Sequence, residues 1–499
     1  RHSKGGGVDR LSGLDASFLY LETPSLHMHV AMANVFDPTT VPGGYSFDRL
    51  KAHIAERLPL APVFGRRLVE VPFRLGHPVW AEDPTFDLDY HVRLAAVPRP
   101  GGLKELADLA GDIVGRPLDR SKPLWEMWVV EGLAGGRIGF ITKMHHCTVD
   151  GVSGAELLSI LFDLEPEPAP RPPTGAPAGS PARIPAPVEL AAQALVSAAL
   201  RPFEIARDAV STGRRVLDVR RLRQLAESRP DVHKAALPLS APRTSFNAAI
   251  TRRRTVALAA IGLDDVKRLK NAEGTTVNDV VLAVCTGALR RFLADGGELP
   301  DRPLVAVVPV SVRPEGEAAG TNKVSSLFVN LPTNLSDPLA RLRAIHLGTR
   351  GAKEEHHALG ARTLLDWAEH ASPAVFATAA RLYSRMRLAD RHRPIANLVI
   401  SNVPGPDFPL YLGGAELVAG FPLGPIMDGM GVNVTIMSYR GVLYWGIVAC
   451  PETVPRAWQL AADIPLALDE LLEAAGLEPA SFRSDEAVDA ARAAGAALD

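Results

Sequence analysis

Hydrophobic and polar residues follow two spacings along this chain, and each spacing predicts a different element. Apolar residues alternate with polar ones in His27–Phe36 and Asp89–Val97, as in strands whose successive side chains point to opposite faces. In Phe47–Leu58 and Leu103–Val114 they recur every three or four positions, which is typical of a helix with one buried face. Both kinds of element occur in both halves of the chain, in a similar order. The pattern therefore predicts an α/β protein.

The remaining elements are predicted from the same two spacings. Further strands are expected at Met127–Val130, Ile138–His146, Val256–Ala260, Leu304–Val312, Asn397–Asn402, Ala415–Ala419, Val432–Tyr439 and Val442–Val448. Further helices are expected at Gly151–Phe162, Asp264–Asn271 and Thr276–Phe292, over most of Leu339–Arg387, and at Ala457–Ala474.

A proline-rich stretch, Glu165–Pro187, interrupts this pattern. Proline at such density excludes helix and central strand and favours an extended linker. We therefore predict four regions in chain order: an N-terminal domain over 1–164, a linker over 165–187, a helical crossover segment over 188–230 and a C-terminal domain over 231–499.

Composition narrows the functional class. Hydrophobic residues make up 47% of the 499 residues, enough for a full core. The 54 Lys and Arg residues nearly balance the 56 Asp and Glu residues, so no basic excess exists to hold a nucleic acid. No apolar run has the length of a membrane span, and Arg1–Gly7 lacks the apolar stretch of a secretory signal. Three scattered cysteines are too few for a disulfide framework, so we expect a reducing, cytoplasmic location.

The most informative stretch is Lys143–Gly154, KMHHCTVDGVSG. His145 and His146 end a predicted strand, so their side chains point to opposite faces and only one of them can face a reactant. The same geometry argues against a metal site made by these histidines and Asp150, and we expect no metal. Gly151 permits a tight exit into the next helix. Two core histidines and a turn aspartate are the plain alternative, but the complete pattern HHxxxDG is more specific than a histidine pair.

That pattern resembles the active-site motif of the CoA-dependent acyltransferases of the chloramphenicol acetyltransferase-like superfamily, which includes peptide condensation domains. The flanking segments are similar to those of the bacterial wax ester synthase/acyl-CoA:diacylglycerol acyltransferase family. These segments are Leu11–Leu21 with Met28–Val30, Phe86–Arg93, Pro117–Glu126, Asn278–Ala283, Val308–Arg313 and Ser401–Pro406. The resemblance implies an α/β (α+β) fold with two acyltransferase-like domains, each a mixed sheet with flanking helices, around a central tunnel.

The resemblance also implies roles for the motif residues. His146 would be the general base that takes the proton of an acceptor hydroxyl, and His145 a packing or positioning residue. Asp150 would hold the turn through an ion pair, for which Arg313 is one candidate partner, or would be the carboxylate of a catalytic triad; the resemblance favours the ion pair. Cys147 invites a nucleophile interpretation, but its side chain should point away from the face that presents His146.

Three further motifs have expected roles, and the first of them has two alternative interpretations. Ser401 and Asn402 would donate hydrogen bonds to the oxyanion of the tetrahedral intermediate, or would cap the turn that follows. Asn278 and Asp279 would cap a helix and also shape the active site. Structural support for the strand that leads to the histidines is expected from Pro123, Leu124 and Trp125.

The implied donor is acyl-CoA, a substrate, and no cofactor is expected. The implied acceptor is a diacylglycerol or a long-chain alcohol, giving triacylglycerol or wax ester. Such acceptors partition into membranes or lipid droplets, so we expect peripheral association with these surfaces. The arginine-rich helical region Glu189–Glu227 would lie at that interface or pack as a crossover over both domains. An amide-forming condensation enzyme and a weakly active lipid-droplet binding protein are the alternative functions.

Overall fold

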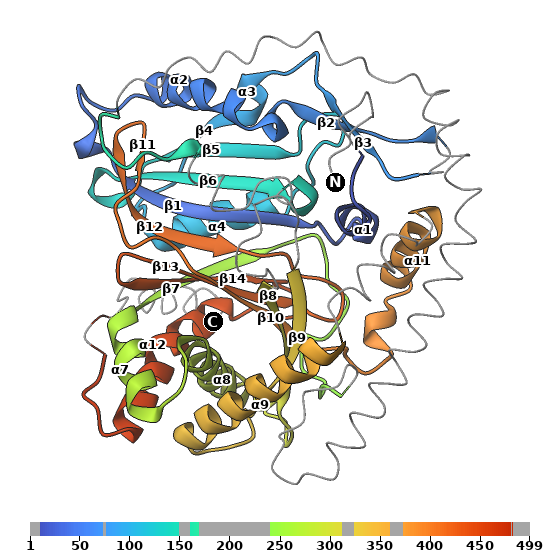
Figure 1. The fold of residues 1–499 in the computed structure, drawn as a ribbon, viewed down its shortest axis with the longest axis vertical. Helices are drawn as coiled ribbons and strands as arrows, with labels where there is room; N and C mark the ends of the chain where they lie inside the picture. The colour runs from blue at the N-terminus through green and yellow to red at the C-terminus, as the bar shows by residue number, and fades with distance from the viewer. Residues whose placement is uncertain are drawn as a thin grey trace.

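The computed structural model describes residues 10–72, 76–148, 160–168, 240–311, 324–359, 373–480 and 482 of the chain. These residues form two mixed six-stranded sheets, one above the other in Figure 1, with helices around them. A two-stranded ribbon of β2 (Arg66–Val69) and β3 (Val79–Glu82) lies beside the upper sheet. The predicted α/β class, with mixed sheets and flanking helices in two domains, is confirmed. The central tunnel stays a prediction.

The first sheet has the strand order β11-β12-β1-β6-β5-β4. Its strands are β1 (His29–Asp37), β4 (Val92–Ala96), β5 (Trp125–Glu131), β6 (Ile138–His145), β11 (Tyr411–Leu412) and β12 (Ala415–Leu423). All neighbours are antiparallel except β4 and β5. The central pair β1–β6 brings His29 opposite His145, so the histidine end of β6 lies beside the start of β1.

The second sheet has the order β7-β14-β13-β10-β8-β9. Its strands are β7 (Thr255–Gly262), β8 (Leu304–Ser311), β9 (Val324–Leu331), β10 (Leu398–Val403), β13 (Val432–Tyr439) and β14 (Val442–Ala449). Strand β10 runs parallel to both of its neighbours, β8 and β13. The carboxyl end of β10 carries Ser401 and Asn402.

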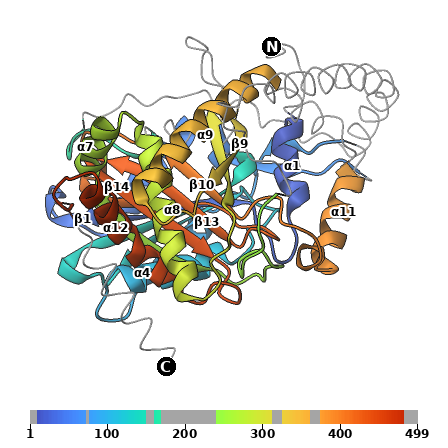
Figure 2. The ribbon, with the colours of Figure 1, turned by 90° about the horizontal axis from the view of Figure 1, so that it is seen from below.

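Helices surround the two sheets, and one of them contacts both. They are α1 (Gly13–Leu21), α2 (Phe47–Arg57), α3 (Leu88–His91), α4 (Leu103–Val114), α7 (Leu263–Glu273), α8 (Val277–Asp295), α9 (Pro338–Leu359), α11 (Pro373–Arg385) and α12 (Ala457–Ala474). Helices α8, α9 and α12 lie in front of the second sheet in the view from below (Figure 2). Helix α4 packs against β1 and β6 of the first sheet and against β7 of the second, so it joins the two layers.

Strand β12 also joins the two halves. It lies beyond the proline-rich segment in the sequence, yet it pairs with β1 in the first sheet and contacts β13 and β14 of the second. The two sheets approach so closely here that a Cβ on Gly446 would come within 1.9 Å of the Pro422 carbonyl oxygen. Only glycine fits at that position. Strands β11 and β12 of the predicted C-terminal region therefore complete the N-terminal sheet, while the predicted domain bounds themselves stay a prediction.

Most predicted elements are confirmed within one or two residues, and α4 and α12 match their predicted bounds. The prediction of a strand over Asp89–Val97 is wrong in its first half: the Asp87 side chain accepts a hydrogen bond from the Asp89 N–H and starts the short helix α3, so β4 begins only at Val92. Helix α1 and strand β9 were not predicted. Most of the predicted helix Gly151–Phe162, most of the linker and the segment 188–230 lie outside the described residues.

Candidate active site

The two histidines of the motif lie at the carboxyl end of β6, and this end of the strand lies beside α1 (Figure 1). The backbone N–H of His145 donates to the Leu124 carbonyl at 3.0 Å, and that of His146 donates to the Met28 carbonyl at 2.7 Å. The chain therefore leaves the strand between these two residues and enters a short 3₁₀ turn, His146–Thr148. Main-chain bonds to neighbouring segments therefore hold the backbone of both histidines in place.

His145 is buried and points into a group of charged side chains. Its Nδ1 accepts a hydrogen bond from the Cys147 backbone N–H at 3.1 Å, so the neutral ring carries its proton on Nε2. That Nε2 lies 3.2 Å from Oε1 of Glu22. Because the N–H is not aimed at the oxygen, the attraction between them is mainly electrostatic. These contacts are those of a positioning residue.

Glu22 is the residue at the centre of this network that the sequence reasoning missed. Its Oε2 accepts a 2.6 Å hydrogen bond from Arg120, and its Oε1 accepts one from the Met28 N–H at 3.1 Å and lies 3.7 Å from Nε2 of His29. Burial would raise the pKa of this carboxyl, but His145, Arg120 and His29 hold the pKa well below its usual range. Glu22 directly follows the motif segment Leu11–Leu21, and this position was the one available signal.

His146 has a different environment, which is apolar. Its ring packs on Phe18 of α1, with the ring centroids 4.1 Å apart, and its Nδ1 is buried without a hydrogen-bond partner among the described residues. The side chain is partly exposed. Desolvation by the surrounding protein, with a smaller contribution from His145, lowers the pKa of His146 to about 4. The imidazole is therefore neutral at pH 7 and free to accept a proton.

Cys147 points away from His146, as the sequence suggested. Its side chain is 3% exposed and packs in a small apolar cluster with Leu19, Leu118 and Leu124. Burial raises the pKa of the thiol well above its usual value. A thiol that stays protonated and inaccessible is a poor nucleophile.

The segment Pro123, Leu124 and Trp125 holds the histidine strand in place. The Leu124 carbonyl accepts the His145 N–H, and the Trp125 indole donates to the Phe64 carbonyl at 2.9 Å. Trp125 is 1% exposed and stacks on His91 at 4.3 Å. These contacts agree with the structural role expected for this motif.

Asp279 joins the start of α8 to α9. It forms a reciprocal capping box with Thr276, and its two carboxylate oxygens also accept hydrogen bonds from His346 Nδ1 and Thr349 Oγ1, both at 2.8 Å. Burial would raise the pKa of Asp279, but the hydrogen bonds from His346, Thr349 and Thr276 lower it. All of these partners are structural, so the described contacts of Asp279 are those of a helix cap.

The structure brings two motifs of the second half together. The Asn402 side-chain amide donates to the side-chain Oδ1 of Asn278 at 3.5 Å, so the end of β10 lies next to the first turn of α8. Ser401 and Asn402 both belong to β10, which continues to Val403. The Asn402 side chain therefore reaches across to α8 instead of capping the turn. A placement of this pair opposite His146 stays a prediction.

Asp150, Gly151 and Arg313 lie outside the described residues, so the proposed ion pair of Asp150 is not tested. Within the part of the chain that is described, no group of three or more His, Cys, Asp or Glu side chains has the arrangement of a metal site.

Comparison with known proteins identifies the family. Residues 11–281 match the wax ester synthase/diacylglycerol acyltransferase catalytic domain, and residues 320–472 match the WS/DGAT C-terminal domain. A Mycobacterium tuberculosis protein provisionally named a diacylglycerol O-acyltransferase is 42% identical over 475 residues, which cover 95% of this chain and 92% of the relative. Another protein from the same organism, with the same provisional name, is 35% identical over 470 residues, covering 93% and 97%.

Solved structures agree. The wax ester synthase/diacylglycerol acyltransferase from Marinobacter aquaeolei VT8 superposes with a TM-score of 0.64 at 30% identity, covering 94% of this chain and 100% of that chain. The starter condensation domain of rhizomide synthetase, solved with C8-CoA and Leu-SNAC, has a TM-score of 0.53 at 12% identity over 95% of both chains, which shows a common fold alone. Since the sequence matches extend over nearly the whole length, the chain belongs to the wax ester synthase/diacylglycerol acyltransferase family.

Proposed function

We propose that this protein transfers a long-chain acyl group from acyl-CoA to the hydroxyl of a diacylglycerol or a long-chain alcohol, with His146 as the general base. The names of its relatives support the reaction class. The observation that carries the assignment of the base is the state of His146: a strand-end imidazole, fixed by its backbone and by Phe18, with a pKa lowered to about 4.

The reaction needs a proton acceptor that later returns the proton. The neutral His146 ring accepts the proton of the acceptor hydroxyl while the oxygen attacks the thioester carbonyl carbon. The tetrahedral intermediate then collapses, the C–S bond breaks, and the imidazolium returns its proton to the leaving thiolate of CoA. A low pKa makes His146 a weaker base but a stronger acid, which favours this return step. No acyl-enzyme is formed, in keeping with a buried, protonated Cys147.

The oxyanion of the intermediate requires hydrogen-bond donors. We assign this role to the strand end of Ser401 and Asn402, whose hydroxyl and amide are neutral donors at the carboxyl end of β10. The bond from Asn402 to Asn278 orients the amide from the first turn of α8. Donors fixed in this way stabilise developing charge without reorganising during the reaction.

One assay tests the proposal and separates it from the alternatives. Purified protein is incubated with a long-chain acyl-CoA and either diacylglycerol or hexadecanol, CoA release is followed, and the lipid product is identified by mass. We expect an ester product with one or both acceptors. A parallel incubation with an amine acceptor that gives an amide, while the two hydroxyl acceptors give no ester, would identify a condensation enzyme. Lipid binding without CoA release would identify a droplet-binding protein.

We also propose reversible, peripheral association with lipid surfaces. None of the helices in the described ranges is both long and apolar enough to cross a bilayer. The arginine-rich region Glu189–Glu227, expected either to lie at that interface or to pack as a crossover, lies outside those ranges. Helix α11 exposes Leu382 (53%) and its flanking Met386 (44%) beside the exposed Arg381 and Arg385, a combination that suits an anionic lipid surface. Replacing both apolar residues by Ser should reduce co-sedimentation with anionic vesicles; unchanged binding would place the docking surface elsewhere.

A further inference from the structure

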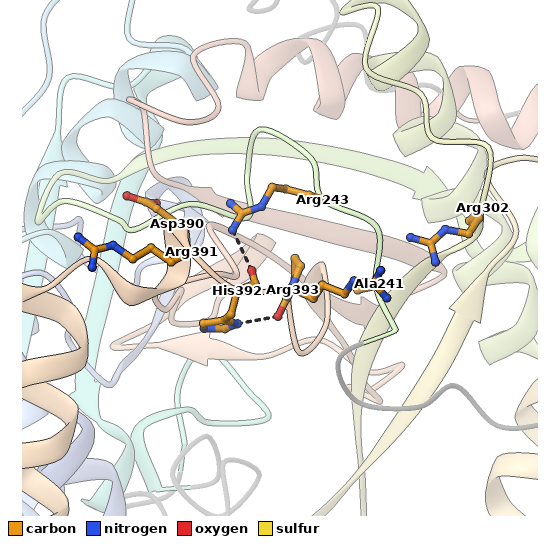
Figure 3. A pocket seen from close by; sticks show the side chains of 8 residues that line it. Ala241, Arg243, Arg302, Asp390, Arg391, His392 and Arg393 are labelled. Carbon is orange, nitrogen blue, oxygen red and sulfur yellow. Dashed lines mark hydrogen bonds between the residues drawn. The ribbon is translucent and has the colours of Figure 1, made fainter.

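A second, positively charged cavity lies apart from the histidines. It has a volume of about 320 Å³ and sits before the amino ends of β8 and β10, since its lining includes Arg302 and Pro394 while these strands begin at Leu304 and Leu398. Its ionisable lining residues are Arg243, Arg302, Arg391, Arg393, His392 and Asp390 (Figure 3). We call this cavity the arginine pocket.

Most of the positive charge of the arginine pocket is not paired with a carboxylate of the described residues. Across the described ranges, no carboxylate forms an ion pair with Arg302, Arg391 or Arg393, and all three side chains are exposed. The pocket's one carboxylate, Asp390, is already used by Arg387 Nε and by the Ala249 N–H, both at 2.7 Å. In Figure 3 Arg393 and Arg302 extend toward each other from opposite sides of the pocket. Two guanidinium groups that face each other repel unless an anion lies between them.

The wall of the pocket is fixed by hydrogen bonds. Arg243 donates to the carbonyl oxygens of Ala389 and His392, both at 2.8 Å. The His392 ring is held between the Tyr383 hydroxyl at 2.5 Å and the Arg393 carbonyl at 2.6 Å. The loop that carries Arg393 is therefore positioned before any ligand binds, which reduces the entropy cost of binding.

Helix α11 connects this wall to the histidine network. Tyr383 contacts His392 of the pocket, and the next residue, Ser384, accepts a hydrogen bond from Thr23 Oγ1 at 3.4 Å. Thr23 follows Glu22, the partner of His145. One turn of α11 thus contacts both the wall of the pocket and the residue that follows Glu22.

We propose that the arginine pocket binds the phosphates of the CoA part of the acyl donor. This inference rests on the proposed function and extends it to the donor-binding residues. Arginine forks bind phosphate oxygens in a bidentate way, and the chain as a whole, with a formal net charge of −2, does not attract a polyanion. Local positive charge is therefore required, and this pocket provides it at a wall that helix α11 links to the segment that carries Glu22, the partner of His145.

The test compares two donors that differ only in the nucleotide. KM and kcat are measured for a long-chain acyl-CoA and for the same acyl group on pantetheine, in wild type and in the double variant Arg302→Gln, Arg393→Gln. We expect the KM for acyl-CoA to rise about ten- to hundredfold in the variant, with kcat within about threefold and the KM for acyl-pantetheine unchanged. Arg350→Gln, an exposed arginine on α9 away from the pocket, should change neither constant.

Three results would overturn the inference. The double variant could keep the wild-type KM for acyl-CoA, or lose affinity equally for both donors, which would indicate a general defect. Inorganic phosphate could bind the wild type as tightly as CoA does in direct titration, which would indicate a free-anion site. A different outcome separates this inference from the proposed function. If wild type transfers no acyl group but still binds CoA through these arginines, the proposed function fails and the pocket assignment stands.

Discussion

The strand ends that carry the two candidate halves of the site differ in charge. At the end of β6, His145 belongs to a network of ionisable side chains that includes Glu22, Arg120 and His29, while His146 projects into apolar surroundings. At the end of β10, Ser401 and Asn402 are neutral, and the nearby carboxylate of Asp279 is committed to helix caps. The first region can therefore change its protonation state, whereas the second offers fixed dipoles.

This difference matches the two tasks of the reaction, which are proton transfer and stabilisation of the oxyanion. Proton transfer needs one group with a free lone pair, and the network around His145 keeps that group in place without competing for the proton. Stabilisation of an oxyanion needs donors that do not ionise. The predictions below test this division, starting with the largest expected effect.

Removing the proton acceptor should have the largest consequence. His146→Ala is expected to lower kcat by about 10²–10⁴-fold, the usual contribution of general-base catalysis, because no other described residue at this strand end presents a neutral imidazole to the face of Phe18. Circular dichroism and urea unfolding should show an intact fold. Activity within a few-fold of wild type would assign the base to another residue.

Breaking the charged network should mainly affect stability. Glu22→Gln leaves the buried His145 without its anion and Arg120 with only the more distant Glu70, and we expect a loss of about 3 kcal/mol in the free energy of unfolding, measured with urea. Glu70→Gln is the matched control, because Glu70 is half exposed and lies 3.8 Å from the same Arg120; its loss should stay below about 1 kcal/mol. Equal losses in both variants would show that Glu22 has no special role.

Loss of the helix cap at the start of α8 should lower the free energy of unfolding by a smaller amount. Asp279→Asn removes a charged acceptor shared by Thr276, His346 and Thr349, and should cost about 1–2 kcal/mol of unfolding free energy. Asp264→Asn, on the exposed first turn of α7 (84% side-chain exposure), should cost much less. A large loss of kcat at unchanged stability would instead give Asp279 a catalytic role and contradict the division drawn above.

The sequence identified the histidines at the end of β6, but it did not predict which residues contact them. The HHxxxDG pattern identified His145 and His146 because their adjacency at a strand end is a local property. Glu22 was missed because its partners His145 and Arg120 are about a hundred positions away, and no local spacing encodes that contact. The split at residues 165–187 did not foresee that β12 returns to the first sheet, because β-pairing across the whole chain depends on tertiary packing. The meeting of Asn402 with Asn278 is non-local in the same sense.

Cys147→Ala should have a modest effect. The substitution removes a buried sulfur from the cluster around Leu124, and we expect about 1 kcal/mol of lost stability with kcat within about threefold of wild type. Iodoacetamide should label Cys147 in the folded wild type only slowly, because burial keeps the thiol protonated. Complete loss of activity in the folded variant would restore the covalent mechanism.

The smallest expected effect is a nearly flat pH profile, and it tests the environment of His146 most directly. A base with a pKa of about 4 stays about 90% neutral at pH 5, whereas an ordinary imidazole with a pKa near 6.5 would fall from about 76% neutral at pH 7 to about 3%. We therefore expect kcat/KM to change less than about twofold between pH 7 and pH 5, and a 20-fold decline would contradict the desolvated site. Burial raises the pKa of the nearby Asp15 to about 6, so Asp15→Asn serves as the control that removes this second titration.

The stability of the protein also changes over this pH range and must be separated from catalysis. Burial lowers the pKa values of His27 and His29, so the unfolded state takes up protons below about pH 6.5 and the free energy of unfolding falls there. The folded fraction should therefore be measured by circular dichroism at each pH, and the rates compared per folded molecule.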